Sequence, residues 1–506
     1  MDQRSRPKSD ERIDPDDLET ALRVIGQLDR LPAEHPDSVT IQQAAAGLYK
    51  SVKKRRKLEK RRQVLEHDAE ITARTATAAP GRIDDETEGL PLVSSAKGAI
   101  AGTLIEARAC YICKQPFHQV DAFYHQLCPD CAAFNHARRD ARTDLTGKRA
   151  LLTGGRAKIG MYIALRLLRD GADTTITTRF PNDAVRRFRA MKDSEEWFDR
   201  LHIVGIDLRD PGQVVDLADS IAAGGPLDIL INNACQTVRR TPDAYAPLIR
   251  AEAEELEPGP VPDIETFARH GEHHLQPAHL EDGNSRWVGN PSGEPEIRPT
   301  PNAASHWAPT PHAIAAMALT AGSADFDLVD SGRAIDAGGL VPDVVDTNSW
   351  IQRVNEVDPI ELLEVQLCNM TAPFILISRL RQAMADSPAR RTYVVNVSAM
   401  EGQFSRGYKG PGHPHTNMAK AALNMLTRTS AQEMLEADGI LMTAVDTGWI
   451  TDERPHPMKK RLADDGFHAP LDLVDGAARV YDPIIRGEEG EDIHGVFLKD
   501  YRPSPW

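Results

Sequence analysis

The feature that most constrains this chain is a regular alternation of short apolar strands and helical patterns, which begins at Lys148. The pattern predicts strands over residues 149–153, 174–178, 202–206, 228–232 and 392–397, with helical stretches such as 161–169 between them. Short apolar strands that alternate with helices form parallel sheets covered on both faces. We therefore expect an α/β fold with a doubly wound parallel sheet over residues 145–506.

Length and composition set the broad class. A chain of 506 residues exceeds one ordinary core, so two or more folding units are expected. Its 41% apolar and 27% charged residues are typical of globular proteins, and its net charge of −15 argues against nucleic acid as the main partner. The charged N-terminus lacks the apolar core of a signal peptide, and no apolar run is long enough to span a membrane. These features predict a cytoplasmic protein without a membrane partner.

Residues 1–100 are predicted to be a helical and partly disordered N-terminal region. Apolar residues repeat at helical spacing within Ile13–Leu31, and residues 40–71 form a second helical stretch with a basic run at Lys53–Arg62. The basic run is either a solvated helix face or a patch for nucleic acid or a membrane surface. Small residues over Ala73–Arg82 predict a flexible linker.

Four of the six cysteines fall within 22 residues and predict a zinc module over residues 101–140. Cys110 and Cys113 form one CxxC pair, and after fourteen residues Cys128 and Cys131 form a second. Two such turns can close a tetrahedron of thiolates around Zn²⁺, a structural site with no open position. Two disulfides or a redox CxxC remain as alternatives. We expect this module to have a core of its own, separate from that of the sheet.

A long insertion is expected over about residues 236–345. It is rich in proline, which argues against long regular elements there. Within it, His270, His273 and His274 are potential metal ligands, but we can name no metal motif with their spacing.

Glycines follow the first expected strand and precede its helix, over Thr153–Gly160. Such a turn lets backbone amides and a helix N-terminus meet a pyrophosphate. Further motifs come later in the chain: Asn232-Asn233-Ala234, Asn369-Met-Thr-Ala-Pro-Phe, Val394–Gly402, Lys420 and Val445–Thr451.

The order and spacing of these motifs resemble the short-chain dehydrogenase/reductase family over nearly all of residues 145–506. With the cysteine pairs, the sequence resembles a divergent subgroup of that family. The resemblance implies a Rossmann-type domain and a nicotinamide cofactor. It places Asp207 and Leu208 at the adenine, Asn233 and Ala234 along the nucleotide, and Lys420 at the nicotinamide ribose. The expected turn contacts are Gly154, Arg156, Lys158, Ile159 and Gly160.

The residues that end the second strand bear on cofactor choice. An acidic residue there favours NAD through the ribose 2′-hydroxyl, but this chain has Thr178-Arg179, with Arg156 and Lys158 in the turn. Cations there favour the 2′-phosphate of NADP. The alternative is that Arg179 only stacks on the adenine, with NAD as the cofactor.

The chain departs from the family pattern at the catalytic positions. Ala399 stands at the family's substrate-binding serine, and Thr416 stands four residues before Lys420, where the family has its tyrosine. Asn369 and Lys420 are retained, and a threonine hydroxyl is a poor proton donor. We hypothesise that Tyr408, in the loop before this helix, supplies the proton, with His413 or His415 as alternatives.

Two functions from different classes fit these residues. The first is an NAD(P)-dependent oxidoreductase that acts on a carbonyl or alcohol with an altered proton donor. The second is a catalytically silent NADP-binding scaffold or sensor. The expected partners are a small-molecule substrate and either a second copy of the chain or a protein held by the zinc module. Nucleic-acid binding is a weaker third idea, opposed by the net charge.

Overall fold

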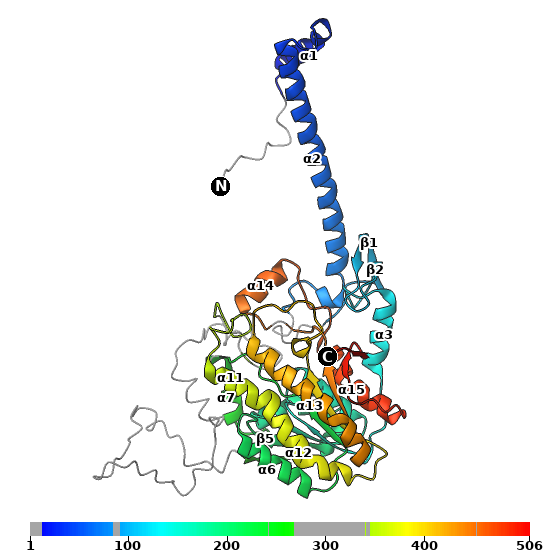
Figure 1. Cartoon of the computed structure of the whole chain (residues 1–506), viewed down its shortest axis with the longest axis vertical. Coiled ribbons are helices and arrows are strands. Elements are labelled where there is room, and N and C mark those ends of the chain that lie inside the picture. The colour runs from blue at the N-terminus through cyan, green and yellow to red at the C-terminus, as the bar shows by residue number, and fades with distance from the viewer. Residues whose placement is uncertain (1–12, 84–91, 241, 268–339, 341–344, 452) are drawn as a thin grey trace, which may run out of the picture. The chain divides into compact units, whose positions relative to one another are not determined.

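The structure is a computed structural model, and it describes residues 13–83, 92–240, 242–267, 340, 345–451 and 453–506 (Figure 1). The chain divides into two compact units, Met1–Glu70 and Ile71–Trp506.

The described part of the first unit is helical, as the sequence predicts. Helix α1 spans Pro15–Gly26, and the Asp14 side chain caps it by accepting hydrogen bonds from the backbone of Asp16 and Asp17. The short turn η1, Leu28–Arg30, precedes the long helix α2, Pro36–Ala73. The predicted basic run lies on α2 and is exposed almost throughout.

The second unit contains a nine-stranded sheet, in the order β11-β10-β9-β8-β6-β3-β4-β5-β7. Strand β3, Arg149–Leu152, lies between β6, Ile229–Asn232, and β4, Asp173–Thr178. The other strands are β5 (Leu201–Gly205), β7 (Asp263–Thr266), β8 (Thr392–Ser398), β9 (Ile440–Asp446), β10 (Phe497–Lys499) and β11 (Arg502–Ser504). All neighbours pair parallel except β10 and β11, so the predicted doubly wound sheet is confirmed.

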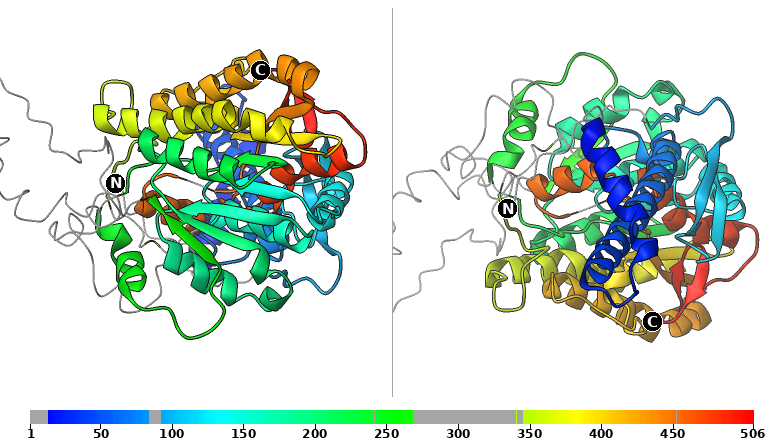
Figure 2. Two further views of the ribbon diagram at one scale, coloured as in Figure 1. Left: turned by 90° about the horizontal axis from the view of Figure 1, so that it is seen from below. Right: turned by 90° about the horizontal axis from the view of Figure 1, so that it is seen from above.

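Helices cover both faces of this sheet (Figure 2). One face packs against α4 (Lys158–Arg169), α5 (Pro181–Arg189) and α15 (Leu473–Glu488). The opposite face packs against α6 (Pro211–Ala223), α12 (Ala372–Ala385) and α13 (Pro414–Asp438). Shorter elements are η4 (Ser194–Glu196), η5 (Phe198–Arg200), η6 (Pro242–Tyr245), α7 (Ala246–Ala253), α11 (Pro359–Gln366), η8 (Leu367–Thr371), η9 (Met400–Gly402) and α14 (His456–Asp464).

One helical segment of the described chain, Pro359–Ala385, is long and apolar enough to cross a membrane by length and composition alone. Core helices of globular proteins pass the same test, and Leu376 and Leu380 of this segment are fully buried against the sheet.

The cysteine module packs directly on the sheet domain. Strands β1 (Ile100–Ala109) and β2 (Pro116–Asp121) pair antiparallel, and α3 (Pro129–Asp140) follows them. Their apolar cluster includes Ile450 and Leu471 of the sheet domain. The Tyr124 hydroxyl also donates to Asp475 on α15 at 2.6 Å. The module's apolar cluster is distinct from the two clusters that flank the sheet, but side chains of the sheet domain complete it, so the two cores are not fully separate as expected.

The stretch predicted as a flexible linker is also packed. Residues Ala76–Ala78 form a buried turn, η2, and the backbone amides of Ala76 and Thr77 donate to the carbonyls of Ala122 and Phe123. Arg82 is buried and donates to the Ala469 and Leu471 carbonyls. The small residues that suggested flexibility instead permit close packing, so this prediction is wrong.

The described part of the insertion contains only short elements. Strand β7 adds an edge strand to the sheet beside β5, and α7 follows η6. His270, His273 and His274 lie outside the described residues.

Candidate functional site

A cavity of about 990 Å³ opens at the carboxyl ends of the central strands. Its walls include Gly154 after β3, Asn233 after β6, Val397 in β8 and Asp446 in β9. Chain order reverses between β3 and β6, and ligands of open α/β sheets bind at such a switch point. Topology and cavity therefore indicate the same site.

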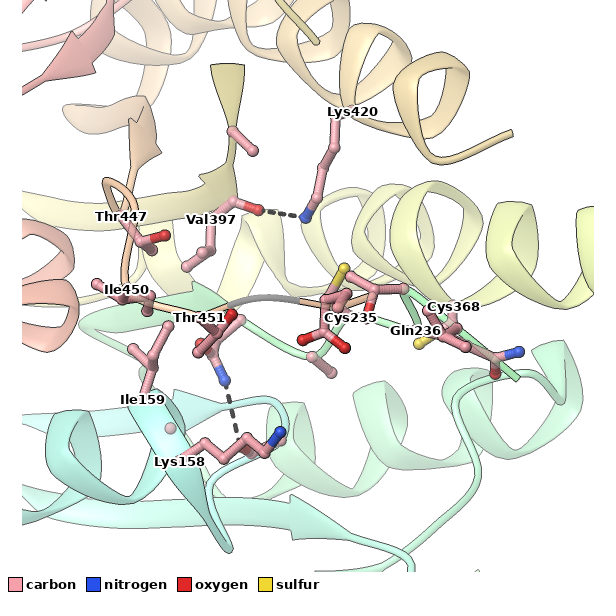
Figure 3. A pocket seen from close by; sticks show the side chains of 18 of the residues that line it. Lys158, Ile159, Cys235, Gln236, Cys368, Val397, Lys420, Thr447, Ile450 and Thr451 are labelled. Atoms are coloured by element: carbon pink, nitrogen blue, oxygen red, sulfur yellow. Dashed lines mark hydrogen bonds between the residues drawn. The ribbon is translucent and has the colours of Figure 1, made fainter. Parts of the chain in front are cut away.

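The glycine turn forms one wall of this cavity (Figure 3). Gly154 has a φ of 70°, and a Cβ atom added at Gly160 would lie 1.9 Å from the Gly154 carbonyl oxygen. Helix α4 begins here without a side-chain cap, so its first amides remain available to an anion. Lys158 occupies the left-handed region at a φ of 53°, where a glycine is normally favoured.

Asn233 ties the end of β6 to the turn. Its side-chain amide donates to the carbonyls of Thr153 at 3.1 Å and Gly154 at 3.2 Å. A Cβ atom at Gly154 would lie 3.0 Å from the Cα of Ala234, so the two segments are in close contact. Asn233 and Ala234 therefore shape the cavity next to Gly154.

Asp207 and Leu208, the expected adenine contacts, both line the cavity. The Arg209 guanidinium holds the Asp207 carboxylate at 2.6 Å and reaches Glu364 at 2.9 Å. Burial acts to raise the pKa of Asp207, but Arg209 outweighs burial and lowers that pKa overall. Asp207 is therefore a charged, fixed wall of the site.

Arg179 and Arg156 also line the cavity, but their partners differ. Arg156 pairs with the Asp183 carboxylate. Arg179 donates to the Tyr245 hydroxyl at 3.3 Å and lies against the rings of Phe180 and Tyr245. Within the described residues Arg179 forms no ion pair with a carboxylate, so its charge is available to an anion in the cavity.

The two family positions retained by the sequence take different places. Lys420 lines the cavity and is buried, and its Nζ donates to the Val397 carbonyl at 2.8 Å (Figure 3). Asn369 lies in the π-helical turn η8, behind the cavity wall. Its side chain accepts from the Gln236 amide at 2.7 Å and donates to the Gln236 carbonyl at 2.9 Å. Asn369 therefore positions the wall rather than lining it.

The candidate proton donors are not brought together. Tyr408 is 75% exposed and is not among the described residues that line the cavity, so the hypothesis that it supplies the proton is not supported. Thr416 is buried on α13 with its hydroxyl unpaired, and it too lies outside the cavity lining. A threonine hydroxyl is attached directly at Cβ and cannot extend from α13 as a phenol would.

The two histidines differ as well. His413 lines the cavity, but its ring is stacked on Trp350 and its Nδ1 lies 2.8 Å from the Trp350 carbonyl oxygen. His415 is buried outside the cavity lining, and burial lowers its pKa. Of the two, only His413 is near enough to a ligand to act on it.

Asp446 is the acid that sequence reasoning missed. It is buried at the end of β9 and lines the cavity. Burial, together with the nearby charges of Asp500 and Glu401, raises its pKa to about 6. A polar residue that ends a central strand was the available signal. Cys235 and Cys368 also line the cavity and were likewise not singled out (Figure 3).

The four predicted cysteine ligands do come together. Their sulfur atoms all lie within 4.8 Å of one another, and the Cys113 and Cys128 sulfurs are 3.6 Å apart. A zinc–sulfur bond of about 2.3 Å places tetrahedral thiolates about 3.8 Å apart. The Cys128 backbone amide lies 3.4 Å from the Cys110 sulfur, as a donor to a thiolate would. The donor set therefore fits a tetrahedral metal ion.

Comparisons with known proteins agree with this geometry. Residues 148–248 match the family model described as short chain dehydrogenase. An uncharacterized protein of Acanthamoeba polyphaga mimivirus is 29% identical over 389 residues, which are 75% of this chain and 71% of that protein. A Streptomyces lividans protein named "Probable oxidoreductase" is 39% identical over 93 residues, which are 18% of this chain and 29% of that protein.

Solved structures with a similar arrangement include a short chain dehydrogenase from Burkholderia cenocepacia in complex with NADP. It is 19% identical, and the match covers 70% of this chain and 97% of that one, with a TM-score of 0.40.

Proposed function

We propose that this chain, which belongs to the short-chain dehydrogenase family through residues 148–248, is an NADP-dependent oxidoreductase acting on a carbonyl or an alcohol. The observation that carries the proposal is the cavity that joins Gly154, Asn233 and Lys420 at the switch point of the sheet. A nicotinamide cofactor bound there would supply or accept a hydride.

Arg179 supports NADP rather than NAD. Arg179 is half-buried and forms no ion pair with a carboxylate of the described residues. Such a cation favours a dianionic phosphate, because hydrogen bonds between charged groups are stronger than those between neutral groups. The Tyr245 hydroxyl and the aromatic rings around Arg179 hold its guanidinium in place. The Asp207 carboxylate also attracts Arg179, but its ion pair is with Arg209, at 2.6 Å.

Asp446 is the proposed proton donor for carbonyl reduction. Reduction places negative charge on the carbonyl oxygen, and a group that is partly protonated near neutral pH can deliver a proton to it. The raised pKa of about 6 keeps a fraction of Asp446 protonated at pH 7. Its carboxyl proton would pass to the substrate oxygen, and solvent would return a proton to the carboxylate.

Lys420 lines the same cavity as Asp446. Its ammonium group is fixed by the Val397 carbonyl at the end of β8, so it presents charge to the cavity without moving. A fixed cation there can bind a ribose hydroxyl and stabilise negative charge on a nearby oxygen.

A silent NADP-binding protein is the second candidate. It is favoured by Ala399, which offers no side-chain hydrogen bond to a substrate, and by Thr416, whose hydroxyl is not among the groups that line the cavity. Cofactor binding without turnover would be its signature.

The cysteine cluster is proposed to hold structural Zn²⁺. Cys110, Cys113, Cys128 and Cys131 would supply four thiolates, whose sulfur atoms lie within 4.8 Å of one another, so no position would be left open for a substrate. Metal analysis of the purified chain should find one zinc ion per molecule, and less than half an equivalent would contradict this assignment.

The function is tested by measuring binding and turnover separately. NADPH fluorescence titration should give micromolar affinity, with NADH weaker by about tenfold or more. A panel of aldehydes and ketones should then yield NADPH oxidation that Asp446→Asn abolishes and Glu453→Gln, a change of another cavity carboxylate, leaves largely intact. Failure of both cofactors to bind would refute the proposal, and binding without any turnover would favour the silent protein.

A further inference from the structure

The turn that carries the first cysteine pair reaches into the cavity. This turn is closed by a hydrogen bond from the Cys110 amide to the Gln115 carbonyl, at 2.9 Å. The Lys114 amide donates to the Cys110 carbonyl at 3.1 Å, and Lys114 adopts a φ of 62°. The turn that sets the two thiolates therefore also fixes the residues between and beside them.

Two of those residues, Tyr111 and Lys114, line the cavity. The Tyr111 hydroxyl accepts a hydrogen bond from the Trp449 amide at 3.0 Å. It donates to no acceptor among the described residues, so its proton is available to a ligand. The Tyr111 amide donates to the Gln126 carbonyl at 2.8 Å, which anchors the residue from the opposite side. Tyr111 thus bridges the cysteine turn and the segment after β9.

The segment after β9 also lies at the centre of the site. Ile450 lies beside Ile159 of the glycine turn, and Thr451 and Lys158 line the cavity close to them (Figure 3). Ile159 and Ile450 belong to the same apolar cluster as Cys110 and Cys128. The cysteine turn, the glycine turn and the segment after β9 therefore contribute to one apolar cluster.

Ion pairs add a second connection between module and site. Arg139 on α3 pairs with Asp472 at 2.5 Å and Asp475 at 3.1 Å, at the start of α15. Leu473, the first residue of α15, lines the cavity. The module is therefore held against the sheet domain by Tyr111 and by Arg139, which shares Asp475 with Tyr124.

From these contacts we propose that the metal of the cysteine cluster and the dinucleotide of the cavity are thermodynamically coupled, with Tyr111 as the ligand contact that transmits the coupling. The proposal rests on the proposed dinucleotide site. Metal binding orders the turn, the ordered turn holds Tyr111 against Trp449, and the hydroxyl then offers its proton to the bound ligand. Linkage requires that the dinucleotide tighten metal binding by the same factor.

The coupling predicts specific effects on the full chain. Removing zinc with a chelator should weaken NADPH binding about five- to tenfold, which lies in the usual range for coupled sites. Saturating NADPH should raise the chelator concentration needed to remove half of the zinc by a similar factor. Both measurements are equilibrium readouts that do not depend on turnover.

Two tyrosine variants separate coupling from a general loss of folding. Tyr111→Phe keeps all four cysteines and should keep its zinc, yet bind NADPH about fivefold more weakly because one hydrogen bond is lost. Tyr124→Phe removes a hydroxyl from the same module that contacts Asp475 and does not line the cavity. It should bind NADPH as the unmodified chain does.

The outcomes distinguish this proposal from the function beneath it. If the zinc-replete chain binds no NADPH, the proposed function fails and the coupling fails with it. If that chain binds NADPH but chelation and Tyr111→Phe leave the affinity unchanged, the coupling alone is overturned. Weaker binding in Tyr124→Phe, equal to that in Tyr111→Phe, would also overturn it, because the effect would then come from module stability.

Discussion

Replacing Asp446 by Asn tests whether the raised pKa of this buried carboxyl group destabilises the folded chain at neutral pH. Asp446 is buried with Asp500 and Glu401 nearby, while Lys499 and the Gly448 amide only partly offset their charge. A pKa of about 6 in place of 3.8 means that the folded chain holds a proton that the unfolded chain releases. Folding is therefore opposed progressively as pH rises between these two values, and fully above about 6.

The size of this effect on the free energy of unfolding follows from the pKa shift of Asp446. A pKa raised from 3.8 to about 6 corresponds to about 3 kcal/mol of unfolding free energy lost at neutral pH. Asn cannot ionise and has nearly the shape of Asp, so Asp446→Asn should recover up to about 3 kcal/mol above pH 7. At pH 4 the two proteins should be almost equally stable, because both side chains are then uncharged in the folded state.

The assay is chemical denaturation followed by tryptophan fluorescence, run on both proteins at pH 4 and pH 7.5. Asp492→Asn is the matched control, because Arg391 and Arg390 lower the pKa of Asp492 to about 2 at an exposed site. It should destabilise the chain at pH 7.5, by about 1 kcal/mol at most. A gain for Asp446→Asn that is equally large at pH 4, or no gain at pH 7.5, would refute the reasoning.

Three further predictions concern cofactor, metal and loop. Arg179→Ala should weaken NADPH binding about tenfold in fluorescence titration and leave NADH within about twofold, because only NADPH carries the 2′-phosphate; equal losses would contradict the NADP assignment. Cys128→Ser should lower the melting temperature of the whole unit Ile71–Trp506, because Cys128 shares an apolar cluster with Ile450 and Leu471 of the sheet domain. A separate small transition in calorimetry, with the main transition unchanged, would contradict this. Tyr408→Phe should change neither NADPH affinity nor turnover, because Tyr408 is 75% exposed outside the cavity lining, and a large loss of turnover would reinstate it as a donor.

The sequence predicted the parts of the fold that local pattern controls. The runs that became β3, β5, β6 and β8 are mainly apolar, and the run that became β4 is rich in β-branched residues. The glycines at 154 and 160 are required by a positive φ and a close approach. Asn233 and Lys420 follow from their distance along the chain from that turn. The strand and glycine signals lie within a few residues of the structure that they specify.

What the sequence did not predict depends on long-range packing. Strand β7 comes from the proline-rich insertion, and its pairing with β5 is decided by the sheet edge. The burial of Ala76–Ala78 depends on the cysteine module, which follows it in the chain. Tyr111 reaches the cavity only because the module packs on the segment around Trp449, more than 300 residues later.

The altered catalytic positions can be understood from the same packing. In the proposed oxidoreductase the proton donor would come from an element other than α13, because Thr416 is not among the residues that line the cavity. Asp446 enters from β9 and bears a carboxyl group whose ionisation opposes folding at neutral pH. A protein that only held a dinucleotide would be more stable with a neutral residue there, and polar groups that cost stability are characteristic of sites that act on a ligand. The buried acid therefore favours the oxidoreductase over the silent nucleotide-binding protein.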